Sequence, residues 1–155
     1  MLTHNLQKCP ALFADLSESR QVERPDLDRD TAHSLAHFLE TGLYHTLEVP
    51  GLSKAEKDFL EYERSVLVYQ AADILQLPDL GALAEEKIME YDRRVSIFNA
   101  MDVAQEVYEK LQNPTWYRRY LGGKIDEAFA FNEDLFFNNR FLRYIGKKEI
   151  FKEHF

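Results

Sequence analysis

The stretch Tyr69–Ile88, YQAADILQLPDLGALAEEKI, places two helical patterns on either side of a proline. Small residues such as Ala72 and Ala84 stand between large apolar ones, so two helices with these patterns can approach each other closely. Pro78 is tolerated in the first turn of a helix but not in its interior, so the second helix begins close to it. The sequence therefore predicts a two-helix hairpin, and this hairpin carries no pattern typical of an enzyme active site.

Upstream of the hairpin, apolar residues recur at three- and four-residue steps over Thr31–Thr41. This spacing predicts a helix with Asp30 as its N-cap and Gly42 as its C-cap. His33 and His37 stand four apart on this helix, the spacing that two imidazole ligands of one metal ion need. No third ligand and no HExxH glutamate accompany them, so we interpret them as a partly exposed pair on the polar helix face.

The hairpin continues a longer helical region on both sides. Its first helix is expected to run from about Lys54 to Leu75, and Ser53 with Glu56 has the spacing of a capping box. After the hairpin, helices are predicted over the ranges 95–111, 116–122, 125–131 and 134–145, with the glycines at 122 and 123 separating the second of these from the third.

Strand patterns are few. Val22–Leu27 has apolar residues at both ends, but Pro25 removes a hydrogen-bond donor and restricts the segment to an edge strand. Leu43–Val49 alternates in the manner of a short strand. Either segment is equally compatible with a loop, so we predict a mainly α fold, α+β at most.

Composition excludes several classes of function. The chain has 155 residues, of which 45% are hydrophobic, enough for one sizeable core. A net charge of -8 repels phosphate backbones, so no nucleic-acid partner is expected. No segment approaches the roughly 20 apolar residues of a membrane span, and the start MLTHNLQKCP lacks the pattern of a leader. We therefore expect a cytoplasmic or nuclear protein with no membrane partner.

Catalytic, cofactor and metal sites are not expected either. Cys9 is the one cysteine, and no base for it is evident in the sequence around it. Glycine-rich phosphate loops and nucleophile motifs are absent from the sequence. Aromatic residues are frequent near the C-terminus, where their helical spacing favours core or docking surface over a ligand pocket: Phe129, Phe131, Phe136, Phe137, Phe141, Phe151 and Phe155.

The order of these features over residues 6–91 resembles a BTB/POZ domain of the fungal type with a helical C-terminal extension. The resemblance rests on Cys9–Phe13 as a Ser-Pro-x-Phe-like turn, on the strand candidate after it, on the helix end HFLETGLY and on the hairpin. Phe38 and Glu40 occupy positions that the family usually fills with tyrosine, whereas Gly42 and Tyr44 match. The family's first strands and first helix, which supply much of its dimer interface, have no counterpart here.

This resemblance implies two regions. Residues 1–91 would form an N-terminally incomplete BTB/POZ-like helical cluster with a short residual β element. Residues 92–155 would form a helical C-terminal extension packed on that cluster.

The resemblance also implies a non-catalytic protein–protein interaction module, serving as an adaptor or an oligomerisation domain. The expected partners are proteins: a second copy of the chain, or a cullin scaffold of a ubiquitin ligase docked through the hydrophobic-x-Glu element Leu16 and Glu18. Exposed aromatics around Tyr44 and in the range 136–144 are the expected contact residues. The alternatives are a small-molecule binder or enzyme with an aromatic C-terminal pocket, and a fragment without a function of its own.

Overall fold

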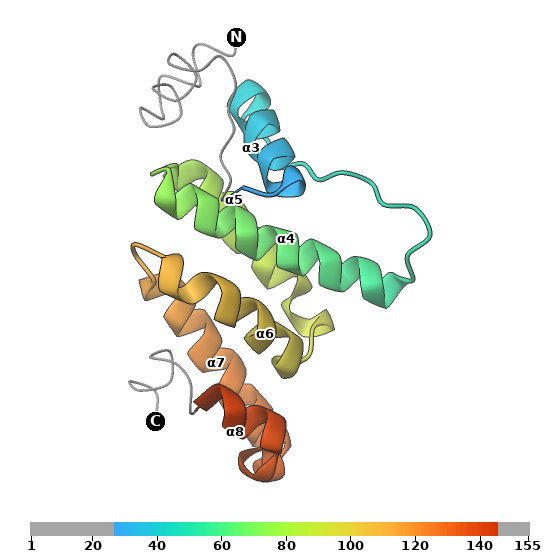
Figure 1. The fold of residues 1–155 in the computed structure, drawn as a ribbon, viewed down its shortest axis with the longest axis vertical. Coiled ribbons are helices and arrows are strands. Elements are labelled where there is room, and N and C mark those ends of the chain that lie inside the picture. The colour runs from blue at the N-terminus through green and yellow to red at the C-terminus, as the bar shows by residue number, and fades with distance from the viewer. Residues whose placement is uncertain (1–26, 146–155) are drawn as a thin grey trace. The chain divides into compact units, whose positions relative to one another are not determined.

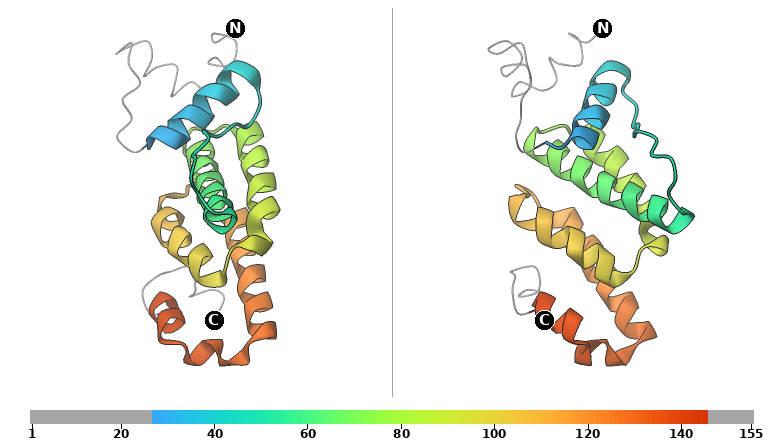
Figure 2. Two further views of the ribbon diagram at one scale, coloured as in Figure 1. Left: turned by 90° about the vertical axis from the view of Figure 1, so that its right-hand side faces the viewer. Right: turned by 45° about the vertical axis from the view of Figure 1, so that its right-hand side comes forward.

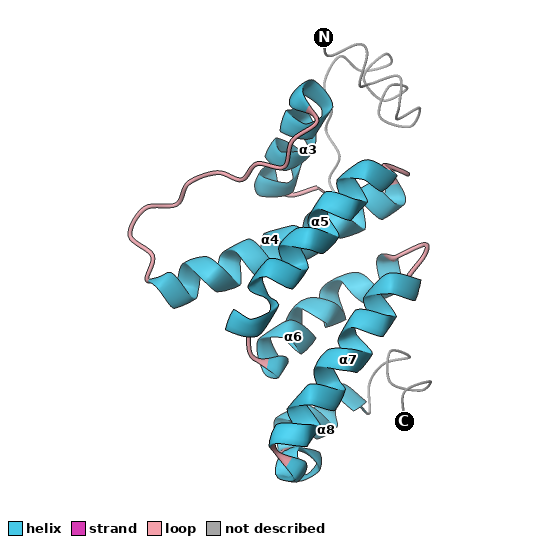
Figure 3. Ribbon diagram, turned by 180° about the vertical axis from the view of Figure 1, so that it is seen from behind, coloured by secondary structure: helices cyan, strands magenta, loops and turns pink. Residues whose placement is uncertain are grey.

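The computed structural model describes residues 27–145 and is built of helices (Figure 1). The chain divides into two compact units, Met1–Arg94 (unit 1) and Val95–Phe155 (unit 2). Figure 3 shows helices and loops throughout the described range, which contains no strand. The prediction of a mainly α fold is therefore confirmed. No helix in this range has both the length and the apolar character that a membrane span requires.

From residue 27 onward, unit 1 contains α3 (Arg29–Thr41), α4 (Lys54–Ile74), α5 (Pro78–Tyr91) and the short 3-10 turn η1 (Asp92–Arg94). α4 and α5 form an antiparallel pair, and α3 packs against α4 (Figure 2). A long loop crosses from the end of α3 to the start of α4 (Figure 1). The two-helix hairpin predicted from Tyr69–Ile88 is the centre of this unit.

The turn of the hairpin is a Schellman motif. The Leu77 N–H donates to the Ala72 carbonyl at 2.8 Å, and the Gln76 N–H donates to the Asp73 carbonyl at 3.3 Å. Gln76 adopts φ +57°, a left-handed conformation that glycine usually supplies at this position. Pro78 follows as the first residue of α5, where its missing N–H costs nothing. The chain thus reverses direction within three residues.

Close packing of α4 on α5 uses the small residues that the sequence places there. A Cβ added to Gly81 would lie 3.8 Å from the Ala72 Cβ, which is ordinary van der Waals contact. Leu80, Ala84 and Ile88 are 0% exposed on the inner face of α5. Burial of each large aliphatic side chain contributes about 1.5–3 kcal/mol, so this face is the main stabilising element of the hairpin.

Helix ends in unit 1 are capped largely as predicted. The capping box is confirmed: the Glu56 N–H donates to Ser53 Oγ at 3.2 Å, and the Ser53 N–H donates to Glu56 Oε2 at 2.8 Å. Gly42, at φ +74°, is the predicted C-cap of α3. The predicted N-cap Asp30 is wrong, because the Thr31 N–H donates to Asp28 Oδ1 at 2.7 Å and Asp30 lies inside the first turn.

Unit 2 contains α6 (Ile97–Val107), η2 (Tyr108–Lys110), α7 (Thr115–Phe131), η3 (Glu133–Phe137) and α8 (Asn139–Ile145). α6 contacts both α7 and α8 (Figure 3). The helix predicted over 134–145 is broken at Asn138, whose Oδ1 accepts from the Arg140 N–H at 2.9 Å and begins a new helix.

The predicted break at the glycine pair is wrong. α7 is one helix through Gly122 and Gly123, because the buried stripe of Tyr117, Leu121 and Ile125 outweighs a cost of about 1 kcal/mol for each glycine. Leu43–Val49, which the sequence left open between a strand and a loop, is a loop in which side chains satisfy backbone carbonyls. Of the other strand candidate, residues 22–26 lie outside the described range and Leu27 is in a bend.

Candidate functional site

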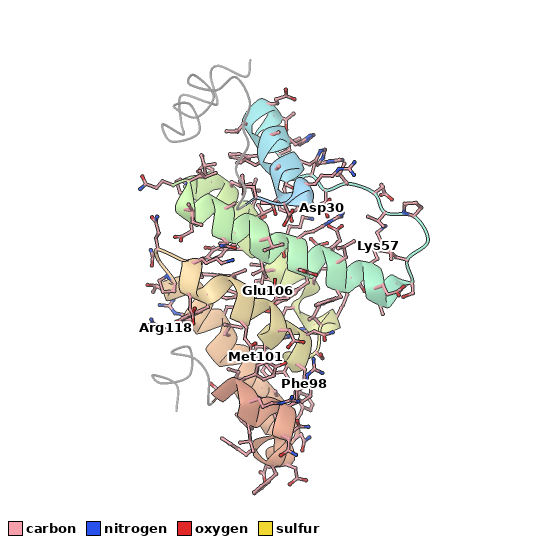
Figure 4. All side chains as sticks on the ribbon, in the orientation of Figure 1. Asp30, Lys57, Phe98, Met101, Glu106 and Arg118 are labelled. Carbon is pink, nitrogen blue, oxygen red and sulfur yellow. The ribbon has the colours of Figure 1, made fainter. Side chains whose placement is uncertain are left out.

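Arg64 is a buried charge that joins α3, α4 and the loop between them. Its guanidinium is 4% exposed and donates to the Leu47 carbonyl at 2.7 Å, to Glu61 Oε1 at 2.8 Å and to Asp30 Oδ2 at 3.1 Å. Asp30 lies at the side of α3 that faces α4 (Figure 4). A buried charge is tolerated when it is paired and hydrogen-bonded, and here one cation serves three segments.

Burial acts against the charged form of Arg64, but the hydrogen bonds that Arg64 donates to Asp30 and Glu61 outweigh it, and the pKa of Arg64 is raised. Glu61 also accepts a hydrogen bond from Thr46 Oγ1 at 2.9 Å, which fixes a second point of the loop. The loop is therefore anchored to α4 at Thr46 and Leu47.

Tyr44, a predicted contact residue, lies just before this anchor and faces inward. Its ring is half-buried, and its hydroxyl oxygen is buried without a hydrogen-bond partner in the part of the chain that the structure describes. Burial, and next the Glu61 carboxylate, raise the pKa of Tyr44 above its ordinary value of 10.0. Lys87 Nζ on α5 lies 6.0 Å from the ring centroid. Only part of the tyrosine is thus presented to solvent.

Three imidazoles gather where the loop leaves α3, and we call His33, His37 and His45 the histidine clasp. The His37 and His45 rings are stacked with centroids 4.6 Å apart, and the His33 and His45 centroids are 5.1 Å apart. His33 Nε2 lies 2.9 Å from His45 Nδ1, within hydrogen-bond distance. Burial and then the neighbouring imidazoles of His45 and His37 lower the pKa of His33 from 6.5.

The sequence predicted two of the three residues of the clasp, His33 and His37, as neighbours and did not predict that His45 joins them. His33 and His37 are partly exposed, as predicted, but the third ring comes from a loop whose path no periodicity reveals. Ser34 Oγ donates to the His45 carbonyl at 2.7 Å and brings that ring to the pair. Among the described side chains, no group of three or more His, Cys, Asp or Glu residues has the arrangement of a metal site.

In unit 2, α7 is followed by the turn η3 and then by α8 (Figures 1 and 3). Several large apolar side chains of these three elements are exposed. We call this surface the aromatic end; its members are Phe131, Phe136, Phe137 and Leu142. Phe131 is 93% exposed and Phe137 is 81% exposed, whereas Phe136 stacks on Phe129 with centroids 4.1 Å apart. The exposure of adjacent phenylalanines is unusual, because this side chain normally contributes to a core.

The aromatic end is held in place by a buried ring and a polar network. Phe141, which is fully buried, meets Phe129 edge-on at a centroid distance of 5.2 Å. Arg140 donates to Asp102 Oδ2 at 2.7 Å, and Tyr144 also donates to Asp102, so that α8 is fastened to α6. Burial, and next the bond to Asp102, raise the pKa of Tyr144.

The range 136–144 therefore has two kinds of aromatic residue. The structure exposes Phe136 and Phe137 and buries Phe141 and Tyr144, which the sequence had grouped as one contact surface. Periodicity alone does not separate these pairs, because the boundary is set by the break at Asn138.

A small pocket between α3 and α4 offers little chemistry. It is lined by Leu27, Asp28, Thr31, Leu67, Gln70, Ala71, Ile74 and Leu75. Asp28 is the one ionisable residue in this lining, and its carboxylate already caps α3. General acid–base catalysis needs titratable groups that converge on a substrate, and this pocket does not supply them.

The remaining predicted site residues, Leu16 and Glu18, lie outside the described residues, as does Cys9.

Comparison with known proteins identifies a family. One family model, the HAC6 N-terminal domain, matches residues 2–95, and another, the HAC6 small helical domain, matches residues 96–154. Two subtelomeric hrmA-associated cluster proteins, from two strains of Aspergillus fumigatus, are each 33% identical to this chain over 140 residues. The match covers 87% of this chain and 35% of each relative, so the chain spans about a third of the length of these relatives. No solved structure matches the chain.

These matches overturn the BTB/POZ resemblance. Small residues in a helical hairpin and a glycine after a helix are requirements of helix packing in general, so they occurred here without the BTB/POZ fold. The cullin-adaptor hypothesis for Leu16 and Glu18 rested on that resemblance and is withdrawn with it. The boundary between the two matching models, after residue 95, falls next to the boundary between unit 1 and unit 2. The chain belongs to the HAC6 family.

Proposed function

We propose that this chain is a non-catalytic protein-interaction module and that the aromatic end of unit 2 is its contact surface. The observation that carries the proposal is the exposure of two phenylalanine side chains in unit 2: Phe131 is 93% exposed and Phe137 is 81% exposed. Large apolar side chains that a folded protein leaves exposed are common at sites of protein–protein interaction.

Another member of the aromatic end, Phe136, is already held in place. Phe136 is fixed between Phe129 and the buried Phe141, so little side-chain entropy is lost when a partner covers it. Exposed polar residues adjoin the rings, among them Glu133, Asp134 and Asn138. An apolar centre with a polar rim is the usual anatomy of a protein–protein interface.

The test compares the chain with a double variant, Phe131→Gln and Phe137→Gln. Tagged wild-type and variant chains are used to capture proteins from the native cell, and each captured protein is then purified and titrated against the chain by calorimetry. We expect at least one partner whose affinity falls by about tenfold or more in the double variant, because hot-spot aromatics each contribute about 1–3 kcal/mol. Sedimentation of the chain alone tests whether that partner is a second copy.

A matched control carries Leu43→Gln and Met89→Gln, which are also exposed apolar residues but lie in unit 1. This control should keep the affinity of the wild type. Equal affinity for every purified partner in all three chains would contradict the proposal. The fluorescence of Trp116, the one tryptophan, verifies that unit 2 of the double variant remains folded.

A further inference from the structure

The first part of the loop is held on α3 by the hydrogen bonds from Ser34 Oγ to the His45 carbonyl and from the Leu43 N–H to Thr41 Oγ1, and the histidine clasp adds contacts that depend on protonation. The 2.9 Å contact between His33 Nε2 and His45 Nδ1 needs an N–H on one ring and a lone pair on the other. At least one of these two rings must therefore be neutral. His37, stacked on His45 at 4.6 Å, adds a third imidazole to the same small volume.

We propose that the histidine clasp is an acid-sensitive latch. It holds loop residues 43–45, which include Tyr44, in the closed position at neutral pH and releases them when its imidazoles are protonated. Two imidazolium rings cannot form the bond between His33 and His45, because both facing nitrogens then carry hydrogen. Three cations with centroids 4.6–6.2 Å apart also repel one another.

Other charged groups face the latch from the surrounding helices. On His33, the Asp30 carboxylate of α3 favours protonation and the Arg64 guanidinium of α4 opposes it. Around Tyr44 lie Glu61 of α4 and Glu90 of α5, whose negative charges act on its hydroxyl. Carboxylates and guanidinium groups ordinarily titrate far from neutral pH, whereas histidine is the residue type that ordinarily changes charge between about pH 7.5 and 5.5.

The sign of the effect follows from the lowered pKa of His33. In the released or unfolded chain His33 binds a proton near the ordinary pKa of 6.5, whereas in the closed latch the pKa of His33 is lower. Closure is thus undisturbed above about pH 6.5 and weakens as the pH falls toward the lowered pKa.

Release is confined to a short segment, because the loop is fastened on both sides. Gly42 ends α3 in a left-handed conformation, and Thr46 and Leu47 stay bound to Glu61 and Arg64. Between these points lies Tyr44, whose buried hydroxyl has no hydrogen-bond partner in the described part of the chain. Exposure of this hydroxyl to water would satisfy it, which favours opening once the clasp is weakened.

Hydroxyl-radical footprinting read residue by residue tests the latch on the full chain. The oxidation rate of Tyr44 is compared at about pH 7.5 and pH 5.5, on either side of the ordinary histidine pKa. EDTA is present throughout, so that bound metal ions do not contribute. We expect the rate at Tyr44 to rise about threefold or more in acid, while Tyr62, which is 0% exposed, stays protected and excludes global unfolding.

Variants separate the clasp from other effects of acid. The triple variant His33→Gln, His37→Gln, His45→Gln should lose the pH response, whereas the control His4→Gln, His154→Gln, which alters the other two histidines of the sequence, should keep it. If the triple variant loses protection of Tyr62, the single variant His45→Gln is used instead. A wild-type Tyr44 rate that does not change with pH, or a triple variant that responds like the wild type, would overturn the proposal.

Discussion

The α4–α5 hairpin and the aromatic end are both built from apolar side chains at helical spacing, yet they meet solvent in opposite ways. In the hairpin, Leu80 and Ile88 are fully buried, whereas at the aromatic end Phe131 and Phe137 are almost fully exposed. Helical spacing determines which side chains share a face. It does not determine whether anything covers that face.

Residue size explains the difference. In the hairpin, Ala72, Gly81 and Ala84 leave room for the large residues of the opposite helix, so the two surfaces interlock. The aromatic end has no such small residues among its members: Phe131 is the last residue of α7, and Phe136 and Phe137 are adjacent in the 3-10 turn η3. The large side chains of the hairpin are therefore buried against each other, whereas those of the aromatic end remain exposed.

The largest expected effect is in the hairpin core. Leu80→Ala removes a fully buried side chain and should lower the stability of unit 1 by about 2–5 kcal/mol, from lost burial and a residual cavity. Native-state hydrogen exchange of the most protected amides in α4 measures this loss. Met89→Ala, at an exposed position of the same helix, is the control and should change little. Similar losses in both variants would show that the hairpin does not interlock as described.

Next in size is the buried polar network. Arg64→Met should lower the stability of unit 1, measured by the same hydrogen exchange in α4, by about 1–3 kcal/mol. Asp30, Glu61 and the Leu47 carbonyl lose their hydrogen-bond donor in this variant. Arg140→Met provides the comparison in unit 2, where Trp116 fluorescence in urea reports the loss. Since Arg140 is half-exposed, its effect should be clearly smaller. An equal or larger effect at Arg140 would contradict the structural ranking of the two arginines.

A gain is expected at the hairpin turn. Gln76→Gly should raise the stability of unit 1 by about 1 kcal/mol, because glycine adopts the left-handed conformation without steric cost. Gln70→Gly, in the interior of α4, should lower it by about as much. Both variants replace glutamine with glycine, so a gain of stability at position 76 and a loss at position 70, measured by hydrogen exchange, would be due to the different backbone conformations of the two residues. A loss at Gln76 would mean that its side chain contributes contacts that outweigh the strain.

The smallest effect is predicted at the aromatic end. Phe131→Ser together with Phe137→Ser should leave the stability of unit 2 within about 0.5 kcal/mol of the wild type, because neither ring is buried. Phe141→Ala, which removes the fully buried ring beside them, should cost about 3–5 kcal/mol. Urea unfolding followed by Trp116 fluorescence distinguishes the two. A large loss in the double serine variant would place these rings in the core.

Predictions from sequence succeeded where a local rule acts alone. The Ser53–Glu56 capping box, the Gly42 cap and the hairpin around Pro78 each depend on residues within a few positions of one another. They failed where distant groups compete. Asp30 has the chemistry of an N-cap, but Arg64, 34 residues later, takes its carboxylate, and Asp28 caps the helix instead.

The candidate sites follow the same division. Phe131 and Phe137 were visible in the sequence as apolar residues, but their exposure depends on where α7 stops and on the turn after it. His45 could not be joined to His33 and His37 from the sequence, because the loop path is set by Ser34 and Arg64.

What the sequence by itself determined was the set of helices in and before the hairpin and the closeness of α4 to α5, since residue size and capping act over a few positions. Only the tertiary structure decided which aromatic rings are left at the surface, which aspartate caps α3 and which histidines meet. These depend on side chains far apart in the chain, whose encounters no local pattern encodes.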